Sequence, residues 1–369
     1  MKYSVLAPLV IILITTLGSI STVSAKEIYD CTILNKSGKY IIKNDIINLN
    51  NNTVCIDIKV SNIFLDCNLH SIKGNFVEDS YGILTNSSQR LKNIKIENCI
   101  LQEWGKQGVT ITNTTGATLK NLEASNNLRK GMLIFNSKEI IVENSTLSYN
   151  EQEGISIEDS SKIIIKNNYV LNNLGLTGIM LKNNVNGGSI ENNNLVNNVH
   201  GGIRLENNIQ DIKIKNNQIK SNGVGSGIWL EDNIKRNLIE NNEILNNSFG
   251  LVITEDSSKN IVKSNYIGNN YIGIIIADAA NNFIYDNFFN NTNNVEIYNP
   301  TNNNGANFWS ILKRAGKNVI GGQYLGGNFW ATQSGNGYSE TCLNSNNDDF
   351  CDKPYIIEEN NIDSLPLTF

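Results

Sequence analysis

The strongest constraint in this 369-residue chain is a phrase that repeats from residue 82 to about residue 293. Each copy starts with a glycine and an apolar–any–apolar pattern, followed by polar residues, a second apolar pair and an Asn-rich turn. The leading glycines are Gly82, Gly108, Gly131, Gly154, Gly178, Gly202, Gly227, Gly250 and Gly273. Because their spacing stays between 23 and 26 residues, the chain is predicted to stack one structural unit along an axis, as solenoid proteins do.

The copy that starts at Gly227 indicates what each unit forms. Its apolar residues fall into three short runs with the two-residue period of strands, and Asn-Asn pairs end the second and third runs. Asparagine tolerates the left-handed conformation of tight turns. Three short strands per copy, closed by turns, predict an all-β fold in which each copy is one coil of a parallel β-helix.

Asparagines also recur at matching places in successive copies. Stacked side-chain amides can bond one another along the axis of a stacked-strand structure, so two structural Asn ladders are expected. They are Asn168, Asn193, Asn217, Asn242, Asn265 and Asn287, and Asn150, Asn173, Asn198, Asn222, Asn247 and Asn270.

The repeat divides the chain into a leader, two caps and a rod. The predicted parts are residues 1–25 (signal peptide), 26–81 (N-terminal cap and first coils), 82–293 (β-helix repeats) and 294–369 (C-terminal capping region). Lys2, the apolar run 9–14 and the small residues before Ala25 fit a cleaved signal, and an uncleaved anchor is the alternative. After cleavage no membrane span remains, which predicts a secreted or cell-surface protein.

The cysteines fit an exported protein. They are Cys31, Cys55, Cys67, Cys99, Cys342 and Cys351, an even number placed at the two ends of the rod. Disulfides are expected outside the cell, with Cys342–Cys351 as the local pair. Among the three connectivities of the other four, we favour Cys31–Cys55 with Cys67–Cys99. A zinc site is the rival interpretation, but no C-x2-C spacing occurs.

Seven Asn-x-Ser/Thr sequons predict a glycoprotein. The sequon asparagines are Asn35, Asn51, Asn86, Asn113, Asn144, Asn246 and Asn290.

The two ends of the chain resemble a known family. The tail segments 326–330 (GGNFW), 348–355 (DDFCDKPY) and 363–367 (DSLPL) are similar to the end of archaeal cell-surface proteins in the NosD-like β-helix family, which reads GGNYW, GDGIGDTPY and DxYPL. The head, 31–74, is similar to their start. The resemblance implies a right-handed, single-stranded parallel β-helix of the pectin-lyase-like type, related to carbohydrate-binding and sugar-hydrolase repeats. The glycines of GDG are missing from this chain.

One face of the rod carries a candidate binding site. The second and fourth residues after each leading glycine point outward on the same face, and its middle combines a tryptophan with charged groups. The candidate carbohydrate-binding residues are Trp229, Arg204, Glu206, Glu231, Glu158, Lys182 and His200. An indole can stack on a sugar ring, and charged groups can bond hydroxyls or uronate carboxylates. The alternative is an ordinary solvated face with weak ion pairs.

Catalysis on this face is the second interpretation. Glycosidases use two carboxylates about 5–9 Å apart, and Glu206 and Glu231 on adjacent coils are the candidate pair. Neither the Asp-rich strings of polygalacturonases nor a basic column facing an Asp cluster is found in the sequence. We therefore favour a non-catalytic role over a polysaccharide hydrolase or lyase.

Metal sites have little support in the sequence. The chain has two histidines, His70 and His200, and three methionines, so copper, which binds imidazole and sulfur ligands, is not expected. Calcium fits better, because the tail places oxygen ligands at positions 1, 3, 5 and 9 of a loop. These residues are Asn344, Asn346, Asp348 and Asp352. The alternative is a polar loop closed by a disulfide.

Composition limits the partners. The formal net charge is −5 and no Lys/Arg cluster occurs, which argues against nucleic acid. The sequence predicts an exported envelope protein that binds a polysaccharide or a surface glycoprotein. A polysaccharide-degrading enzyme and a structural spacer are the alternatives, and the oligomeric state is open.

Overall fold

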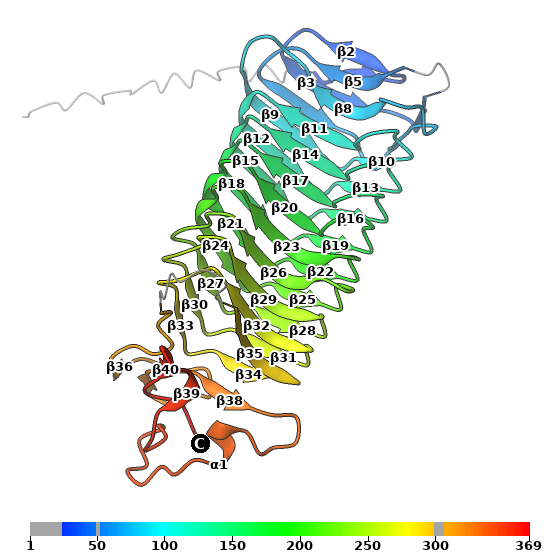
Figure 1. Ribbon diagram of the computed structural model, residues 1–369. Helices are drawn as coiled ribbons and strands as arrows, with labels where there is room; N and C mark the ends of the chain where they lie inside the picture. The colour runs from blue at the N-terminus through cyan, green and yellow to red at the C-terminus, as the bar shows by residue number, and fades with distance from the viewer. Residues whose placement is uncertain (1–23, 49–51, 299–305) are drawn as a thin grey trace, which may run out of the picture.

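The computed structural model describes residues 24–48, 52–298 and 306–369. The predicted fold is confirmed: the chain winds into a right-handed parallel β-helix. Three parallel sheets, each of twelve strands, run side by side along the rod (Figure 1). Within each sheet every strand pairs with the strand one coil away, so paired strands in the repeat region are about one repeat apart in the sequence.

The three sheets share this coil-by-coil order. Sheet A contains β1 (Lys26–Ile28), β3 (Gly38–Ile42), β6 (Ile63–Asp66), β9 (Leu91–Glu97), β12 (Thr114–Lys120), β15 (Lys138–Glu143), β18 (Ser161–Lys166), β21 (Asn186–Glu191), β24 (Gln210–Lys215), β27 (Leu238–Glu240), β30 (Ile261–Lys263) and β33 (Phe283–Tyr285). Sheet B contains β2 (Thr32–Leu34), β5 (Val54–Ile58), β8 (Tyr81–Thr85), β11 (Val109–Thr112), β14 (Met132–Phe135), β17 (Ile155–Glu158), β20 (Ile179–Lys182), β23 (Gly201–Glu206), β26 (Ser226–Glu231), β29 (Phe249–Thr254), β32 (Ile272–Ala277) and β35 (Asn293–Tyr298). Sheet C contains β4 (Ile46–Ile47), β7 (Ser71–Lys73), β10 (Ile100–Gln102), β13 (Glu123–Ser125), β16 (Thr146–Ser148), β19 (Tyr169–Leu171), β22 (Asn194–Val196), β25 (Gln218–Lys220), β28 (Glu243–Leu245), β31 (Tyr266–Gly268), β34 (Phe288–Asn290) and β38 (Phe329–Ala331).

The core follows from the apolar positions of the repeat. Each coil sends one or two aliphatic side chains inward from each sheet, and in the coil from Gly227 these include Ile228, Ile239 and Ile244, all fully buried. The leading glycine is required by space. A Cβ on Gly227 would lie 2.4 Å from Ile244 Cγ2 and 2.7 Å from the Gly250 carbonyl oxygen. Glycine therefore lets the start of each sheet B strand pack closely against sheet C and the next coil.

The two residues of each Asn-Asn pair have different roles, one in the turn and one in the ladder. Asn241 adopts a left-handed turn conformation with a φ of 56°, whereas Asn242 is buried. Asn242 Nδ2 donates to Asn265 Oδ1 at 3.0 Å, and its Oδ1 accepts from Asn217 Nδ2 at 2.9 Å. The same bonds join every consecutive pair of both predicted ladders. A third ladder that was not predicted links Asn237, Asn260, Asn282 and Asn307.

All six cysteines form disulfides, and the pairs are the expected Cys31–Cys55, Cys67–Cys99 and Cys342–Cys351. The first two brace the N-terminal coils. Of the predicted signal segment, residues 1–23 lie outside the described residues. Among the described residues, no helix has the length and apolarity needed to cross a bilayer.

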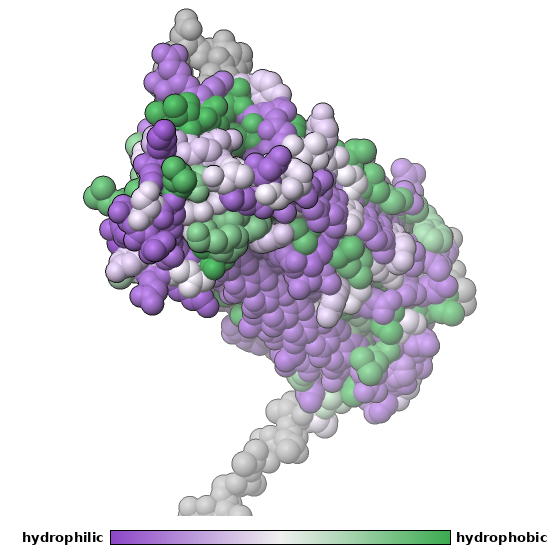
Figure 2. All heavy atoms as spheres, turned by 90° about the horizontal axis from the view of Figure 1, so that it is seen from below, coloured by the Kyte–Doolittle hydropathy of each residue, from purple (hydrophilic) through white to green (hydrophobic). Residues whose placement is uncertain are grey.

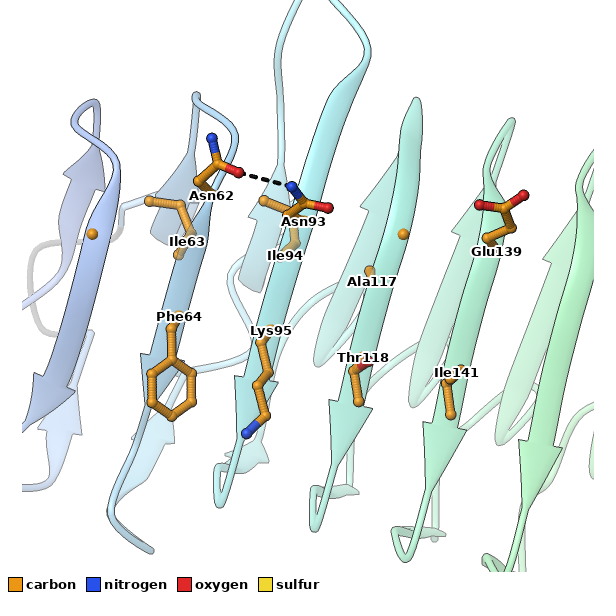
Figure 3. A pocket seen from close by; sticks show the side chains of 12 residues that line it. Asn62, Ile63, Phe64, Asn93, Ile94, Lys95, Ala117, Thr118, Glu139 and Ile141 are labelled. Carbon is orange, nitrogen blue, oxygen red and sulfur yellow. Dashed lines mark hydrogen bonds between the residues drawn. The ribbon is translucent and has the colours of Figure 1, made fainter.

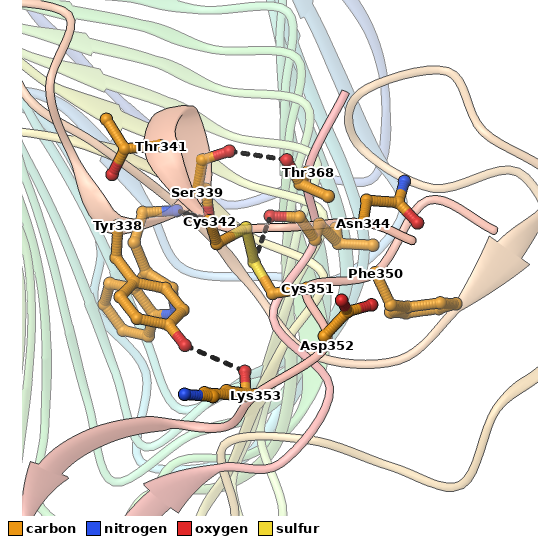
Figure 4. Close-up of a disulfide and its surroundings, with 12 residues drawn as sticks. Tyr338, Ser339, Thr341, Cys342, Asn344, Phe350, Cys351, Asp352, Lys353 and Thr368 are labelled. Carbon is orange, nitrogen blue, oxygen red and sulfur yellow. Dashed lines mark hydrogen bonds between the residues drawn. A yellow bond between two sulfur atoms is a disulfide. The ribbon is translucent and has the colours of Figure 1, made fainter. Parts of the chain in front are cut away.

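The C-terminal region closes the rod. It contains the β36 (Arg314–Ala315) and β37 (Tyr324–Leu325) pair, the short helix α1 (Tyr338–Thr341), and the β39 (Tyr355–Glu358) and β40 (Asn361–Asp363) hairpin. Figure 4 shows α1 beside the last disulfide, where Thr368 Oγ1 donates to the Ser339 carbonyl at 2.7 Å. The parallel sheets reach from Lys26 to Ala331 and so extend on both sides of the predicted repeat range 82–293.

The hairpin strand β40 binds the ends of two Asn ladders, one that ends at Asn307 and one that continues from Asn287 to Asn328. The Asn307 backbone N–H donates to Asn361 Oδ1 at 3.2 Å, and the Asn328 N–H donates to Asp363 Oδ2 at 2.7 Å. Trp330 Nε1 also donates to Asp363, at 2.9 Å. Asp363 is fully buried, and this burial raises its pKa to about 7. The ladder register therefore fixes where the cap docks.

Candidate functional site

A groove runs along the outer face of sheet B. It consists of a polar hollow of about 410 Å³ and an apolar hollow of about 310 Å³, which share Leu176 and His200 in their walls. Its floor is the row of second residues after the leading glycines, and the strand register confirms that these stack in consecutive coils. The central row is Ser156, Met180, Arg204, Trp229, Val252 and Ile275. At about 4.8 Å per strand, this floor is about 24 Å long.

The side wall of the groove comes from the turns that lead from sheet C into sheet B. Leu174 and Leu176 lie in one such turn and Val224 lies in another, and all three side chains are exposed. Exposed aliphatic side chains along a rim add apolar surface at which a ligand can displace water. The groove therefore has an apolar side wall and a floor of polar and apolar side chains.

Lys130 lies at the centre of the ion pairs in the polar half of the groove. Its Nζ lies 2.8 Å from Glu158 Oε1, 3.8 Å from Glu153 Oε2 and 2.9 Å from Ser156 Oγ. Burial acts to raise the pKa of Glu158, but the hydrogen bond and positive charge of Lys130 prevail and hold it below its ordinary value. Glu158 is therefore a charged acceptor at neutral pH.

Arg204 organises the centre. Its Nη2 lies 3.1 Å from Glu206 Oε2 and also pairs closely with Glu231, while Lys182 Nζ lies 2.9 Å from the other oxygen of Glu206. Glu206 and Glu231 are direct neighbours in the strand register, an arrangement of like charges that is unfavourable by itself. The arginine between them offsets this repulsion.

The surroundings of Glu231 favour its protonated form. Burial raises the pKa of Glu231 above its ordinary value, against the opposing charge and hydrogen bond of Arg204, and the negative charges of Glu206 and Glu255 act in the same direction as burial. A carboxyl group in these surroundings holds a proton more readily than an ordinary surface glutamate.

Trp229 joins the centre to the apolar half. The Arg204 guanidinium lies over the indole, with Cζ 4.4 Å from the ring centroid, and Trp229 Nε1 donates to Thr254 Oγ1 at 3.2 Å. The indole face toward Arg204 is therefore covered by the guanidinium. A sugar would meet the remaining indole surface together with Val224 and Val252, which line the same hollow.

The structure brings all seven sequence-predicted binding residues to this groove or its edge. Sequence reasoning missed Lys130 and Glu153, which immediately precede leading glycines. That position was a usable signal, because it also faces the groove. The wall residues Leu176 and Val224 lie in turns of varying sequence, and no repeat signal marks them.

A second hollow of about 540 Å³ lies on sheet A near the N-terminal end. Figure 3 shows Phe64, Lys95, Thr118 and Ile141 side by side on adjacent strands, and Asn93 Nδ2 bonded to Asn62 Oδ1 at 2.9 Å. Lys95 Nζ lies 4.5 Å from the centroid of the Phe64 ring. The hollow is a shallow trough above small side chains, and its one aromatic ring is covered by lysine.

The proposed calcium loop is already bonded internally. Asp348 Oδ2 pairs with Lys313 Nζ at 2.7 Å, and Asp352 Oδ2 accepts from Ser345 Oγ at 2.6 Å. Asn344 Oδ1 accepts from the Asp348 N–H at 3.2 Å. In the part of the chain that the structure describes, no group of three or more His, Cys, Asp or Glu side chains could hold a metal ion. Calcium binding at this loop stays a prediction, and these contacts disfavour it.

Of the sequons, Asn51 lies outside the described residues. Four asparagines are exposed, namely Asn35, Asn86, Asn144 and Asn246. Asn113 and Asn290 are partly buried, and Asn290 Oδ1 is enclosed without a hydrogen-bond partner. Glycosylation stays a prediction, and the exposed positions are its best sites.

Comparisons with solved structures agree on the fold. The crystal structure of the periplasmic alginate epimerase AlgG superposes with a TM-score of 0.54 at 15% identity, covering 71% of this chain and 72% of that one. The crystal structure of Dettilon tailspike protein (gp208) gives a TM-score of 0.57 at 14% identity, covering 74% of this chain and 61% of that one. At such identities the likeness concerns the fold alone. The comparison with curated proteins gave no match.

Two family models match the sequence. The model described as periplasmic copper-binding protein (NosD) matches residues 200–335. The model described as right handed beta helix region matches residues 12–177 and 81–235, which together cover more than half of the chain. The chain therefore belongs to the right-handed β-helix family.

Proposed function

We propose that this protein is an extracytoplasmic, non-catalytic polysaccharide-binding protein whose ligand lies in the groove on sheet B. The observation that carries the proposal is the groove itself, which combines an apolar wall, a half-buried tryptophan and hydrogen-bonding side chains over several coils. Sugars present both apolar ring faces and hydroxyl groups, so a site for them needs both kinds of surface. An elongated groove parallel to the axis also suits a polymer.

Location and relatives support this choice. Three disulfides are typical of proteins outside the cytoplasm, and a surface polysaccharide or surface glycoprotein is the partner available there. The alginate epimerase with the same fold bears the name of a polysaccharide-modifying protein. Because fold alone does not determine function, the proposal depends on the groove.

A polysaccharide-degrading enzyme is the second candidate, favoured by the raised pKa of Glu231 next to Glu206. Glycosidases need one carboxyl group as an acid and a second as a base or nucleophile. Against this role, Arg204 pairs with both carboxylates, which reduces the freedom of either to contact a glycosidic oxygen.

Copper binding, suggested by the name of one matching family model, does not fit the residues present. All six cysteines are oxidised to disulfides, and Met132 is fully buried in the core. His70 Nδ1 lies 3.3 Å from Asp45 Oδ1 in an N-terminal coil, far along the rod from His200. Imidazole and sulfur donors therefore do not converge on one site.

The test is a panel of polysaccharides incubated with the secreted protein, with binding followed by calorimetry and with assays for new reducing ends and unsaturated products. We expect saturable binding without products, and weaker binding for Trp229→Ala. Products that disappear in Glu231→Gln would instead establish the enzyme. If neither binding nor products occur with any polymer, the groove is ordinary surface and the protein is a spacer.

A further inference from the structure

The groove has a charge balance that discriminates between classes of polysaccharide. Resting on the proposed function, we infer that the groove takes an uncharged polysaccharide and rejects polyuronates.

The groove and the ion-pair partners of its cations together carry more negative than positive groups. Three cations (Lys130, Lys182 and Arg204), two carboxylates (Glu153 and Glu158) and His200 line the two hollows. Two further carboxylates, Glu206 and Glu231, lie at the edge as partners of Lys182 and Arg204. With the histidine neutral, the balance is one negative charge, so a chain with a carboxylate on each sugar would meet no attractive field.

The cations of the groove are also engaged. Lys130 contacts two carboxylates, at 2.8 and 3.8 Å, and Lys182 contacts one at 2.9 Å. Arg204 is mostly buried and enclosed by Glu206, Glu231 and the Trp229 ring. A uronate that bonds a remaining N–H of one of these cations would lie beside the glutamate already paired with it, and the repulsion between the two carboxylates offsets the new attraction.

The border adds to the repulsion. The turn from sheet B to sheet A holds acidic residues just beyond the floor, and Glu255 is close enough to raise the pKa of Glu231. Asp256 follows Glu255 in the same turn, and Asp159, Asp232 and Asp278 occupy this turn in other coils, whereas Asn183 and Asn207 take the place in the two coils between Asp159 and Asp232. This edge therefore presents carboxylates to an approaching polymer at both ends of the groove.

Neutral sugars do not incur this penalty. Their hydroxyls can donate to Glu158 and Glu206 and accept from Lys130 and Lys182 without breaking the ion pairs, because a charged group can bond several partners. In the other half, Trp229, Val252 and Ile275 offer apolar surface to a ring face. The existing ion pairs then act as a fixed polar lining.

The experiment compares neutral polymers (a β-glucan, a galactomannan and an arabinoxylan) with polygalacturonate and alginate, by calorimetry on the intact secreted protein in EDTA. We expect at least one neutral polymer to bind, with a Kd that changes less than about twofold between 50 and 500 mM NaCl because charge contributes little. Polyuronates should bind at least about tenfold more weakly, a difference of about 1.4 kcal/mol.

Two variants test whether the groove is the cause. Glu206→Gln removes one negative charge while Glu231 still pairs Arg204, and it should improve alginate binding several-fold. Glu240→Gln removes the same charge from sheet A and should leave alginate binding unchanged, with thermal melting as a check of folding for both.

The possible outcomes distinguish a failure of this inference from a failure of the proposed function. Polyuronate binding as tight as neutral binding, and lost in Trp229→Ala, overturns this inference and leaves the groove as a glycan site. Binding of a cationic polymer such as chitosan alone also overturns it, as does an equal gain in both glutamine variants. Binding of no polymer at all refutes the proposed function and the inference together.

Discussion

Sheets A and B present the same kind of strand to solvent, but their charged rows differ. On sheet A, acidic and basic residues alternate from coil to coil through Glu97, Lys120, Glu143, Lys166, Glu191, Lys215, Glu240 and Lys263. On sheet B the corresponding row runs Glu158, Lys182, Glu206, Glu231, so two acids are adjacent.

The charged residues in the sheet A row form ion pairs with one another. Glu240 lies 2.7 Å from Lys215 and 2.6 Å from Lys263, on the coils before and after it. A shift of one coil would put like charges together, so the row favours the native stacking register. Figure 2, seen from the cap end, shows a regularly spaced hydrophilic surface along the rod.

The sheet B row with two adjacent acids is stabilised by an arginine from the neighbouring row of outward residues. Arg204 must reach both acids of sheet B, and its Nε is buried without a hydrogen-bond partner among the described residues. Places where a protein departs from its own local rule without a structural gain are often functional. The comparison of the two sheets indicates that the proposed binding face is the face on which acidic and basic residues stop alternating from coil to coil.

The largest expected effect is on stability, when the arginine is removed. Arg204→Ala should cost about 2 kcal/mol, because it leaves Glu231 partly buried and unpaired next to Glu206, which keeps only Lys182. Lys166→Ala on sheet A should cost about 0.5 kcal/mol or less, since Glu143 keeps its second partner Lys120, 3.6 Å away. Urea unfolding at pH 7 followed by circular dichroism measures both. Equal costs would show that the two rows do not differ as described.

The next effect is on glycan affinity. Trp229→Ala should weaken binding of a neutral polymer about tenfold, by removing aromatic contact. Phe64→Ala removes the aromatic ring of the sheet A trough, which lies between Lys39 and Lys95, and should leave affinity unchanged. Calorimetry with both variants measures the contrast, and a loss in Phe64→Ala would move the site to sheet A.

The smallest effect is on the pH dependence of stability, where the two faces should respond with opposite signs. The pKa of folded Glu231 is raised by burial, so its contribution is present below the unfolded pKa and is lost as pH rises through the folded pKa. Burial also acts to raise the pKa of Glu240, but Lys215 and Lys263 outweigh it and lower the value. Its contribution is present above the unfolded pKa and is lost as pH falls through the folded pKa.

Relative to the parent, Glu231→Gln should therefore gain stability as pH rises above the unfolded glutamate pKa of about 4.3, and Glu240→Gln should lose stability as pH rises toward that pKa from below. Both differences should stay below about 1 kcal/mol, since these glutamates are partly solvated. Thermal melting across pH measures them. Slopes of the same sign in the two variants would contradict the assignment.

Much of the fold could be predicted because the repeat fixes it. The period placed the strands, the outward rows and two Asn ladders, since residues one period apart must stack. The third ladder, through Asn237 and Asn260, was missed because it is shorter. The disulfide pairs followed from position, as each joins parts of the chain that adjacent coils or one loop bring together.

The site was less predictable, for physical reasons. The stacking of Arg204 on Trp229 depends on rotamers that neighbouring coils select, and the wall residue Leu176 belongs to a turn outside the strand period. The ion pair between Asp348 of the proposed calcium loop and Lys313, 35 positions earlier in the chain, could not be predicted from the sequence. Contacts that cross the repeat, or that come from the cap, leave no periodic signal.

Tryptophan quenching tests the central claim most directly. Trp104, Trp309 and Trp330 are buried, so Trp229 is the one of the four tryptophans that acrylamide can reach readily. A neutral polysaccharide bound in the groove should lower the quenching constant with the same Kd that calorimetry gives, and Trp229→Ala should lose the quenchable component. Binding by calorimetry with unchanged quenching would contradict the account, because the ligand would then lie elsewhere on the rod.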